Sequence, residues 1–329
     1  LFSQELAFST KLAGHQAQVS VSAGLAILTA QEQARTDLSR WASMAIYLAK
    51  APGDLGGFVI YNQEQHGAML NTWYEELAVR NALRSGEFKV YYQPIMRIPE
   101  RKAIGFEALV RWERPGLGVV YPNDFLPIVH RAGIAVELGW QIMENAVAGW
   151  RDVLSKRQTM VGEPPYVTVN VDATQLADEG FAQFVIAAIQ RNQMDAKHLA
   201  IEVTEGTLVN DDLALEQIRQ LHSYGVKIAL DDFGSGYNNL GQVHNLPLTA
   251  IKIDRSFLGE NEISAKNQAL ISDMLKIAKS LDLVVVVEGV ETPEVEAKLV
   301  ELGVPLVQGF LYSRAMPLEQ VDGWLADNS

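Results

Sequence analysis

From about residue 88 onward, short apolar runs alternate with stretches in which apolar residues recur every three or four positions. The short runs predict β-strands, and the stretches with helical spacing predict α-helices. The predicted strands span residues 88–95, 102–112, 166–171, 198–204, 227–232, 250–254, 283–288 and 306–310. The predicted helices span roughly 137–155, 180–192, 211–223, 265–281 and 293–301. Apolar strands separated by helices over about 250 residues predict an α/β fold, a TIM-like (β/α)8 barrel.

The first two predicted strands are joined by only a few residues around Pro99, Glu100 and Arg101. A parallel crossover needs a dozen or more residues, so this connection is too short for one. We therefore expect the strand at 88–95 to run antiparallel to its neighbour, which is a departure from the ideal barrel.

The region before the barrel is short and mixed. Residues 18–28 predict a strand, 34–49 predict a helix with Leu38, Trp41 and Leu48 on one face, and 58–61 predict a second strand. This α+β fragment is too small to make a good core by itself. A helix is predicted at 72–85. We therefore divide the chain into an N-terminal fragment, residues 1–62, a linker helix, 63–86, and the barrel, 87–329.

Composition narrows the function classes. The formal net charge of −13 argues against broad binding of polymeric nucleic acid, which needs a basic surface. The chain has no cysteine, which excludes disulfides and Cys-ligated metal sites. No apolar stretch approaches the length of a membrane span, so we expect no membrane contact by this segment. We expect a cytoplasmic location for a piece of a longer parent, and that parent could carry a membrane anchor.

Polar side chains stand at the ends of successive predicted strands. They are Asn170, Glu202, Asp231, Asp232, Lys252, Glu288 and Gln308, and Glu107, within the strand before them, adds a fifth carboxylate. The carboxyl ends of parallel barrel strands meet at one face, where active sites lie. A single acid at a strand end usually marks only the place where the chain meets water. A row of such residues on neighbouring strands instead predicts a site in which several carboxylates come together.

Such a cluster of like charges needs a counter-charge. Carboxylate and amide oxygens are hard ligands suited to Mg²⁺ or Mn²⁺, so one or two divalent cations are the simplest solution. The adjacent acids Asp231 and Asp232 could serve two metals about 3.5–4 Å apart, an arrangement that many phosphodiester hydrolases use. The residues alone therefore indicate a metal-dependent phosphoester hydrolase.

The same positions carry motifs of a known family. They are YQPI at 92–95, EALVR at 107–111, NV at 170–171 with QL at 175–176, EVTE at 202–205, DDFGSGY at 231–237, IKID at 251–254, EGVET at 288–292 and QGF at 308–310. In this order and over residues 75–329, they resemble the EAL-domain phosphodiesterases. Ser235 stands where that family usually has Thr, and Asn238 and Asn239 replace its usual serine pair.

This resemblance implies hydrolysis of cyclic-di-GMP to linear pGpG with two Mg²⁺ or Mn²⁺ ions, and a homodimer formed through the barrel. It implies that Glu107, Asn170, Glu202 and Asp231 hold one metal and that Asp231 and Asp232 hold the second, with Glu288 supporting metal or water. Lys252 would contact the attacking water or the phosphate. Gln93, Arg111, Asp254 and Gln308 would bind substrate, and Glu205 would brace the loop at 231–237.

Residues 1–62 resemble the C-terminal part of a GGDEF diguanylate-cyclase domain, with 19–28 and 34–61 matching its strand and its helix–strand segment. The GGDEF signature itself is absent from this sequence. We therefore expect no cyclase activity from this chain.

Two alternatives stay open at this point. An EAL-like domain could bind cyclic-di-GMP without cutting it, although the metal-ligand positions are all filled by suitable residues. An unrelated barrel lyase could use Lys252 as a Schiff-base nucleophile. The acids around Lys252 favour its charged form, which argues against this second alternative.

Overall fold

The computed structural model describes residues 7–12, 15–27, 35–49, 58–61, 63–157, 164–204, 206, 212–234, 246–259 and 262–328. The chain divides into two compact units, residues 1–78 and 79–329. None of the described helices is long and apolar enough to cross a membrane.

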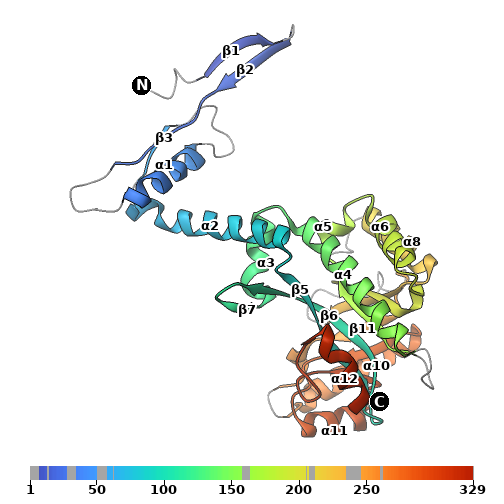
Figure 1. Cartoon of the computed structure of the whole chain (residues 1–329). Coiled ribbons are helices and arrows are strands. Elements are labelled where there is room, and N and C mark those ends of the chain that lie inside the picture. Colours follow the sequence, from blue (N-terminus) through green and yellow to red (C-terminus); the bar gives the residue numbers. More distant parts are fainter. Residues whose placement is uncertain are drawn as a thin grey trace. The chain divides into compact units, whose positions relative to one another are not determined.

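The larger unit is an eight-stranded barrel (Figure 1). Its strands are β5 (Phe88–Arg97), β6 (Lys102–Arg114), β8 (Tyr166–Asn170), β9 (Leu199–Thr204), β10 (Lys227–Phe233), β11 (Ala250–Ile253), β12 (Val284–Val287) and β13 (Leu306–Gln308). From β6 through β13 the neighbours pair in parallel. β5 closes the barrel by pairing antiparallel with both β6 and β13. The predicted fold class, including the antiparallel first strand, is confirmed.

Two short strands extend the sheet outside the closed barrel. β7 (Gly118–Val120) pairs with β6, and β14 (Met316–Pro317) pairs with β5, both antiparallel. The helices are α3 (Pro122–Arg131), α4 (Ala135–Ser155), α5 (Ala173–Leu176), α6 (Phe181–Arg191), α8 (Asp212–Tyr224), α10 (Ala265–Ser280), α11 (Pro293–Leu302) and α12 (Leu318–Asp327), with 3-10 turns η1 (Ala196–His198) and η2 (Arg255–Phe257). The five predicted helices form within a few residues of their expected ends.

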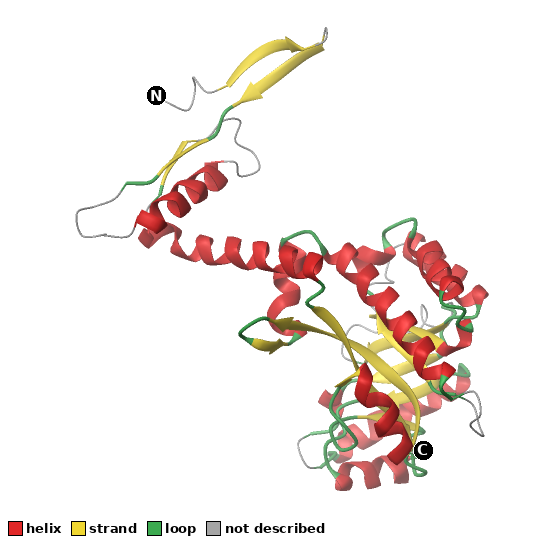
Figure 2. Ribbon diagram, in the orientation of Figure 1, coloured by secondary structure: helices red, strands yellow, loops and turns green. Residues whose placement is uncertain are grey.

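The outer face of the barrel strands packs against these helices (Figure 2). Phe106 on β6 contacts Trp150 of α4, with ring centroids 5.2 Å apart, and Trp324 of α12, with centroids 5.6 Å apart. Tyr92 on β5 stacks on Trp150 at 5.7 Å. Because side chains alternate along a strand, the neighbours of these residues, Gln93 and Glu107, point into the barrel. The aromatic outer layer thus fixes which residues face inward.

The smaller unit has two short sheets. β1 (Ala7–Leu12) and β2 (His15–Ser20) pair antiparallel, and β3 (Ala23–Leu25) pairs in parallel with β4 (Phe58–Ile60). α1 (Arg35–Ala49) lies close to β3, since a Cβ at Gly24 would meet the backbone nitrogen of Ile46 at 2.2 Å. Trp41 of α1 stacks on Tyr61 at 5.3 Å.

Two expectations for this region need correction. Residues 18–28 do not form one strand, because the chain changes partner there, from β1 to β4, and Leu28 lies outside the described residues. The helix expected at 72–85 is longer, since α2 (Gln63–Ser85) begins nine residues earlier. The proposed boundaries of the three parts remain predictions.

Candidate active site

The predicted site residues come from the ends of neighbouring strands. Asn170 is the last residue of β8 and Gln308 the last of β13, and Glu288 directly follows β12. The strand register places Gln93 opposite Glu107 and Asn170 beside Glu202. Strand geometry alone therefore gathers these side chains at the end of the barrel where the parallel strands finish, here called the mouth.

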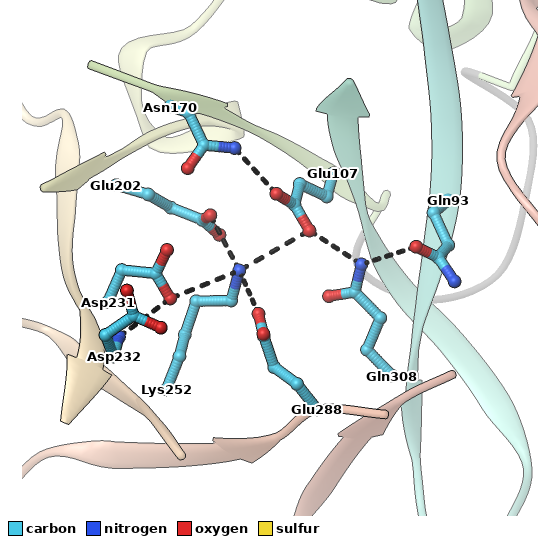
Figure 3. A network of polar contacts seen from close by, with 9 residues as sticks. All are labelled: Gln93, Glu107, Asn170, Glu202, Asp231, Asp232, Lys252, Glu288 and Gln308. Atoms are coloured by element: carbon cyan, nitrogen blue, oxygen red, sulfur yellow. Dashed lines mark hydrogen bonds and ion pairs between the residues drawn. The ribbon is translucent and has the colours of Figure 1, made fainter. Parts of the chain in front are cut away.

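Lys252 on β11 lies at the centre of the mouth (Figure 3). Its Nζ is 2.7 Å from Glu202 Oε2 and 2.5 Å from Glu288 Oε1. Glu107 Oε2 lies 3.4 Å and Asp231 Oδ1 3.8 Å from the same nitrogen. Lys252 is only 1% exposed. One buried ammonium thus meets four carboxylates, and the group carries an excess of negative charge.

Amide side chains complete the network on the other side of Glu107. Asn170 Nδ2 donates to Glu107 Oε1 at 2.6 Å, and Gln308 Nε2 donates to Glu107 Oε2 at 2.7 Å. Gln308 Nε2 also lies 3.2 Å from Gln93 Oε1, and Gln93 Nε2 donates to the carbonyl oxygen of Ser313 at 3.1 Å. These contacts hold the Glu107 carboxylate in one orientation.

Burial and neighbouring charges shift the pKa values of these groups in opposite directions. Burial favours the neutral form of Glu107, but Lys252 and the hydrogen bonds from Asn170 and Gln308 outweigh it and lower the pKa of this carboxyl. Burial, with the nearby Glu107, raises the pKa of Glu202 well above its ordinary value. Burial would lower the pKa of Lys252, yet the surrounding carboxylates hold that pKa well above the ordinary value. The lysine therefore stays charged.

The pKa values of Glu288 and Asp232 are also shifted. Burial raises the pKa of Glu288 to about 7, although Lys252 opposes the shift. Burial and the charges of Asp231 and Asp254 raise the pKa of Asp232. Asp232 adopts a left-handed backbone conformation with φ 56°, and its N–H donates to Asp231 Oδ1 at 3.0 Å. Aspartate tolerates this conformation better than most residues, so the turn presents two adjacent acids at the end of β10.

The sequence profile of the EAL domain family matches residues 76–315, which is more than half of the chain. The chain belongs to the EAL domain family. It is 33% identical over 313 residues to the bifunctional diguanylate cyclase/cyclic di-GMP phosphodiesterase MucR of Pseudomonas aeruginosa, covering 94% of this chain and 45% of MucR. It is 33% identical over 310 residues to the cyclic di-GMP phosphodiesterase PdeR of Escherichia coli, covering 93% of this chain and 45% of PdeR.

A solved structure and a third relative agree with this family assignment. The MucR phosphodiesterase in complex with c-di-GMP superimposes with a TM-score of 0.70 and 35% identity, over 76% of this chain and 99% of that one. The cyclic di-GMP phosphodiesterase RocR of Pseudomonas aeruginosa is 33% identical over 240 residues, covering 73% of this chain and 60% of RocR. The chain spans about half the length of MucR and PdeR, so the complete proteins extend well beyond the matched region.

Two predicted substrate-binding residues lie outside the network of Figure 3. The guanidinium of Arg111 lies 5.0 Å from the ring centroid of Tyr121, and its Nη1 donates to the carbonyl oxygen of Val110 at 2.8 Å. Asp254 caps η2, accepting a hydrogen bond from the Ser256 N–H at 2.9 Å. Glu205 and residues 235–237 lie outside the described residues, so the predicted role of Glu205 remains a prediction.

A cavity of about 260 Å³ opens at the mouth. Gln93, Glu107, Asp231, Glu288 and Gln308 line it, together with residues to which our sequence analysis assigned no role, namely Leu109, Arg255, Gly289, Glu291, Gly309 and Phe310. Arg255, Glu291 and Phe310 each lie one to three residues after a predicted site residue. Glu291 and Phe310 lie inside the EGVET and QGF motifs, and Arg255 directly follows IKID, so membership of these segments was the signal that could have identified them. The Arg314 guanidinium lies 4.2 Å from the ring centroid of Phe310.

The donor set fits divalent cations. Among the residues that the structure describes, no group of three or more His, Asp or Glu side chains is arranged as a metal site by itself. The four carboxylates instead gather around Lys252, whose single positive charge does not balance them. Carboxylate and amide oxygens are the ligands that Mg²⁺ and Mn²⁺ prefer. The remaining negative charge is what such cations would neutralise.

Proposed function

We propose that this chain hydrolyses cyclic-di-GMP to linear pGpG in a reaction that depends on Mg²⁺ or Mn²⁺. The observation that carries the proposal is the group of four carboxylates around Lys252 at the mouth of an EAL-family barrel. Relatives that are 33% identical are cyclic di-GMP phosphodiesterases, which supports the same substrate class here.

In this proposal Glu107, Asn170, Glu202 and Asp231 would hold one cation, and Asp231 with Asp232 would hold a second, with Glu288 beside it. Bound cations of this kind lower the pKa of a water and neutralise the charge that develops on the phosphate. Gln308 and Asn170 keep the Glu107 carboxylate oriented, since both donate hydrogen bonds to it. The negative charge of the group also gives it a strong preference for cations over anions at this position.

The remaining residues would act on the substrate. Lys252 supplies a permanent positive charge at the bottom of the mouth, directed at phosphate oxygens or the attacking water. Gln93 and Gln308 offer hydrogen bonds within the 260 Å³ cavity. Arg111 and Asp254 would contact substrate from the edge of the site. Burial lowers the pKa of the Arg111 guanidinium, although the nearby Tyr121 and Glu107 oppose this shift.

The direct test is incubation of the purified chain with cyclic-di-GMP and chromatographic detection of pGpG, with Mg²⁺, with Mn²⁺ and with EDTA. Product with either metal and none with EDTA would support both parts of the proposal. Binding of cyclic-di-GMP without product would instead make the chain a receptor. A Schiff-base lyase is disfavoured, because the carboxylates around Lys252 keep its nitrogen protonated.

The N-terminal unit is proposed to be the C-terminal part of a GGDEF-like domain. Its parallel β3–β4 pair with α1 packed against β3 is the strand–helix–strand arrangement expected for that part. The match to MucR also extends over 94% of this chain, well beyond the barrel. The homodimer through the barrel and the cytoplasmic location remain predictions.

A further inference from the structure

The inner face of the barrel has a second layer of residues, two positions before the mouth residues on the same strands. Side chains alternate along a strand, so positions two apart point to the same side. Ala200 precedes Glu202, Ala229 precedes Asp231, and Ala250 precedes Lys252. Three neighbouring strands thus contribute only methyl groups to this layer. TIM-barrel interiors are ordinarily filled at such positions by bulky branched residues.

The small side chains leave a cavity of about 460 Å³. Its walls include Ile95, Val286 and Leu306, which pack together, with Ile104 and Tyr166 against them. Glu202, Lys252 and Thr168 form its inner end. A volume of this size lies within the range of about 300–1,000 Å³ that small-molecule sites occupy. The cavity is therefore large enough for an organic ligand.

The cavity lies at the end of the barrel opposite the mouth. Lys102, Tyr166, Lys227, Ala250, Val284 and Leu306 line it, and each is the first residue of its strand. Arg97, the last residue of the antiparallel strand β5, lies at the same end. A ligand here would occupy space separate from the 260 Å³ cavity at the mouth, which shares none of its lining residues.

The rim of the cavity is basic. Arg97 and Lys102 are exposed, and Lys227 is half-buried with its Nζ 4.5 Å from the ring centroid of Tyr166. Among the described residues neither Arg97 nor Lys102 forms a salt bridge. The one carboxylate among the described lining residues is Glu202, at the inner end. This contrasts with the net charge of −13 of the whole chain.

One polar atom inside the cavity has no partner. Thr168 is 2% exposed, and its Oγ1 makes no hydrogen bond within the described structure. An unpaired buried hydroxyl is costly, so a ligand that reaches it gains a hydrogen bond which the protein alone does not make. The cavity therefore combines apolar walls, a cationic rim and one free hydroxyl in its interior.

We propose that this cavity is a second binding site, which takes a small organic monoanion with an apolar body, such as a medium-chain carboxylate. The anionic group would lie at the rim among Arg97, Lys102 and Lys227, and the apolar body would lie against Ile95, Val286 and Leu306. A neutral molecule of the same shape would lose the contact with the cations. The proposal is independent of cyclic-di-GMP hydrolysis, because the site neither opens at the mouth nor needs a metal.

The test is isothermal titration calorimetry of the full chain with sodium octanoate, in EDTA and without cyclic-di-GMP. We expect saturable binding with a dissociation constant below about 1 mM. Binding of 1-octanol should be at least tenfold weaker, and octanoate binding should weaken as salt rises because surface cations are screened. Absence of octanoate binding, or equal binding of octanol, would overturn the proposal.

Variants locate the binding. Ala229→Leu fills the cavity and should weaken octanoate binding at least tenfold, whereas Lys227→Met keeps the apolar stem and should weaken it several-fold with a smaller salt dependence. The control Lys276→Gln removes a charge from the exposed face of α10, where the side chain is 72% exposed, and should leave binding unchanged. If Ala229→Leu does not fold, Ala250→Val is measured in its place. Wild-type affinity in a folded cavity-filling variant would show that octanoate binds elsewhere and would contradict the proposal.

Discussion

The two ends of the barrel interior are built from the same strands yet have opposite chemistry. At the mouth, four carboxylates surround one buried lysine. Two residues earlier on the same strands, alanines and branched apolar residues enclose an open volume with cations at its rim. Neither end follows the usual packed interior of a barrel. The mouth has unbalanced negative charge, and the opposite end has a cavity where side chains would ordinarily pack.

This difference shows that two layers of inward-facing side chains on the same strands can have different chemistry. The backbone fixes which residues face inward, and the outer aromatic layer around Trp150 holds that register. Each inward row can then carry its own chemistry. Changes at the mouth should therefore act mainly on turnover and on charge balance. Changes in the second layer, two residues before the mouth residues, should act mainly on packing and on ligand binding.

The largest expected effect is at Glu107. Glu107→Gln keeps the shape of the side chain but removes its charge and one of the two oxygens that accept hydrogen bonds from Asn170 and Gln308. We expect the rate of pGpG formation to fall by about 10³-fold or more, the size of effect seen when a preorganised electrostatic group is lost. The assay is chromatography of pGpG at saturating Mg²⁺ or Mn²⁺, with thermal unfolding to check folding.

The matched control is Glu100→Gln, an exposed glutamate in the turn between β5 and β6. It changes the same charge at the opposite end of the barrel and should leave turnover near the wild-type value. Equal activity in Glu107→Gln and the wild type would remove the basis for a functional mouth.

The second expected effect tests the charge balance at Lys252. Lys252→Met leaves four carboxylates at the mouth without their ammonium. Breaking buried ion pairs by removing one partner costs about 3–5 kcal/mol, so in EDTA at pH 7 we expect the free energy of unfolding to fall by about 3 kcal/mol. Added Mg²⁺ should reduce the deficit, because a cation that binds the folded state stabilises it. Urea unfolding followed by circular dichroism measures both.

Lys227→Met is the matched control, since it removes a lysine from the opposite end of the same barrel. Because Lys227 is only half-buried, its loss should change the free energy of unfolding by less than about 1 kcal/mol. If Lys252→Met were as stable as the wild type in EDTA, the lysine would not be the counter-charge of the mouth.

Much of the mouth could be predicted from the sequence, because strand ends are local features. The short connection through Pro99, Glu100 and Arg101 sufficed to predict an antiparallel first strand. Polar residues directly after apolar runs sufficed to predict that Glu202, Asp231 and Lys252 meet. Both predictions follow from chain length and alternation, which need no knowledge of distant contacts.

The rest depends on contacts between distant segments. The sequence placed acids near Lys252, but which four of them reach its Nζ depends on the register of several strands at once. The cavity opposite the mouth could not be predicted, because Ala200, Ala229 and Ala250 are individually ordinary strand residues. Their significance appears only when the closed barrel brings them into one layer. The segment predicted as one strand is likewise divided into β2 and β3, because β2 pairs with β1 whereas β3 pairs with β4.

A third prediction concerns a carboxylate outside both layers. Glu296 on α11 accepts a hydrogen bond at 2.9 Å from Arg101 Nε and one at 2.6 Å from the Tyr312 hydroxyl. The hydrogen bond from Arg101 lowers the pKa of Glu296 despite its burial. A lowered pKa in the folded state stabilises the fold above the unfolded pKa of about 4.3, and this contribution is lost as the pH falls through the folded value.

Glu296→Gln should therefore lower the free energy of unfolding by about 1 kcal/mol at pH 7, and the difference should shrink below about pH 4. Urea unfolding at pH 7 and at pH 3.5 measures it. A difference that grows on acidification would contradict the ion pair. Unlike the mouth carboxylates, Glu296 has a single matched cation, so its removal tests an ordinary balanced pair.

The last prediction concerns the stability effect of hydroxyl groups that line the cavity opposite the mouth. Thr168→Val replaces the unpaired hydroxyl with a methyl group of similar size, so the free energy of unfolding should rise by about 1 kcal/mol. Thr249→Val is the matched change in the same cavity, but Thr249 Oγ1 donates to the Ile228 carbonyl at 2.9 Å and accepts from the Ile228 N–H at 3.1 Å. That variant should instead lose about 1 kcal/mol. Opposite signs from the same substitution would show that the Thr168 hydroxyl lacks a partner in the folded protein and lowers its stability. Equal losses would mean that Thr168 already has a partner in solution.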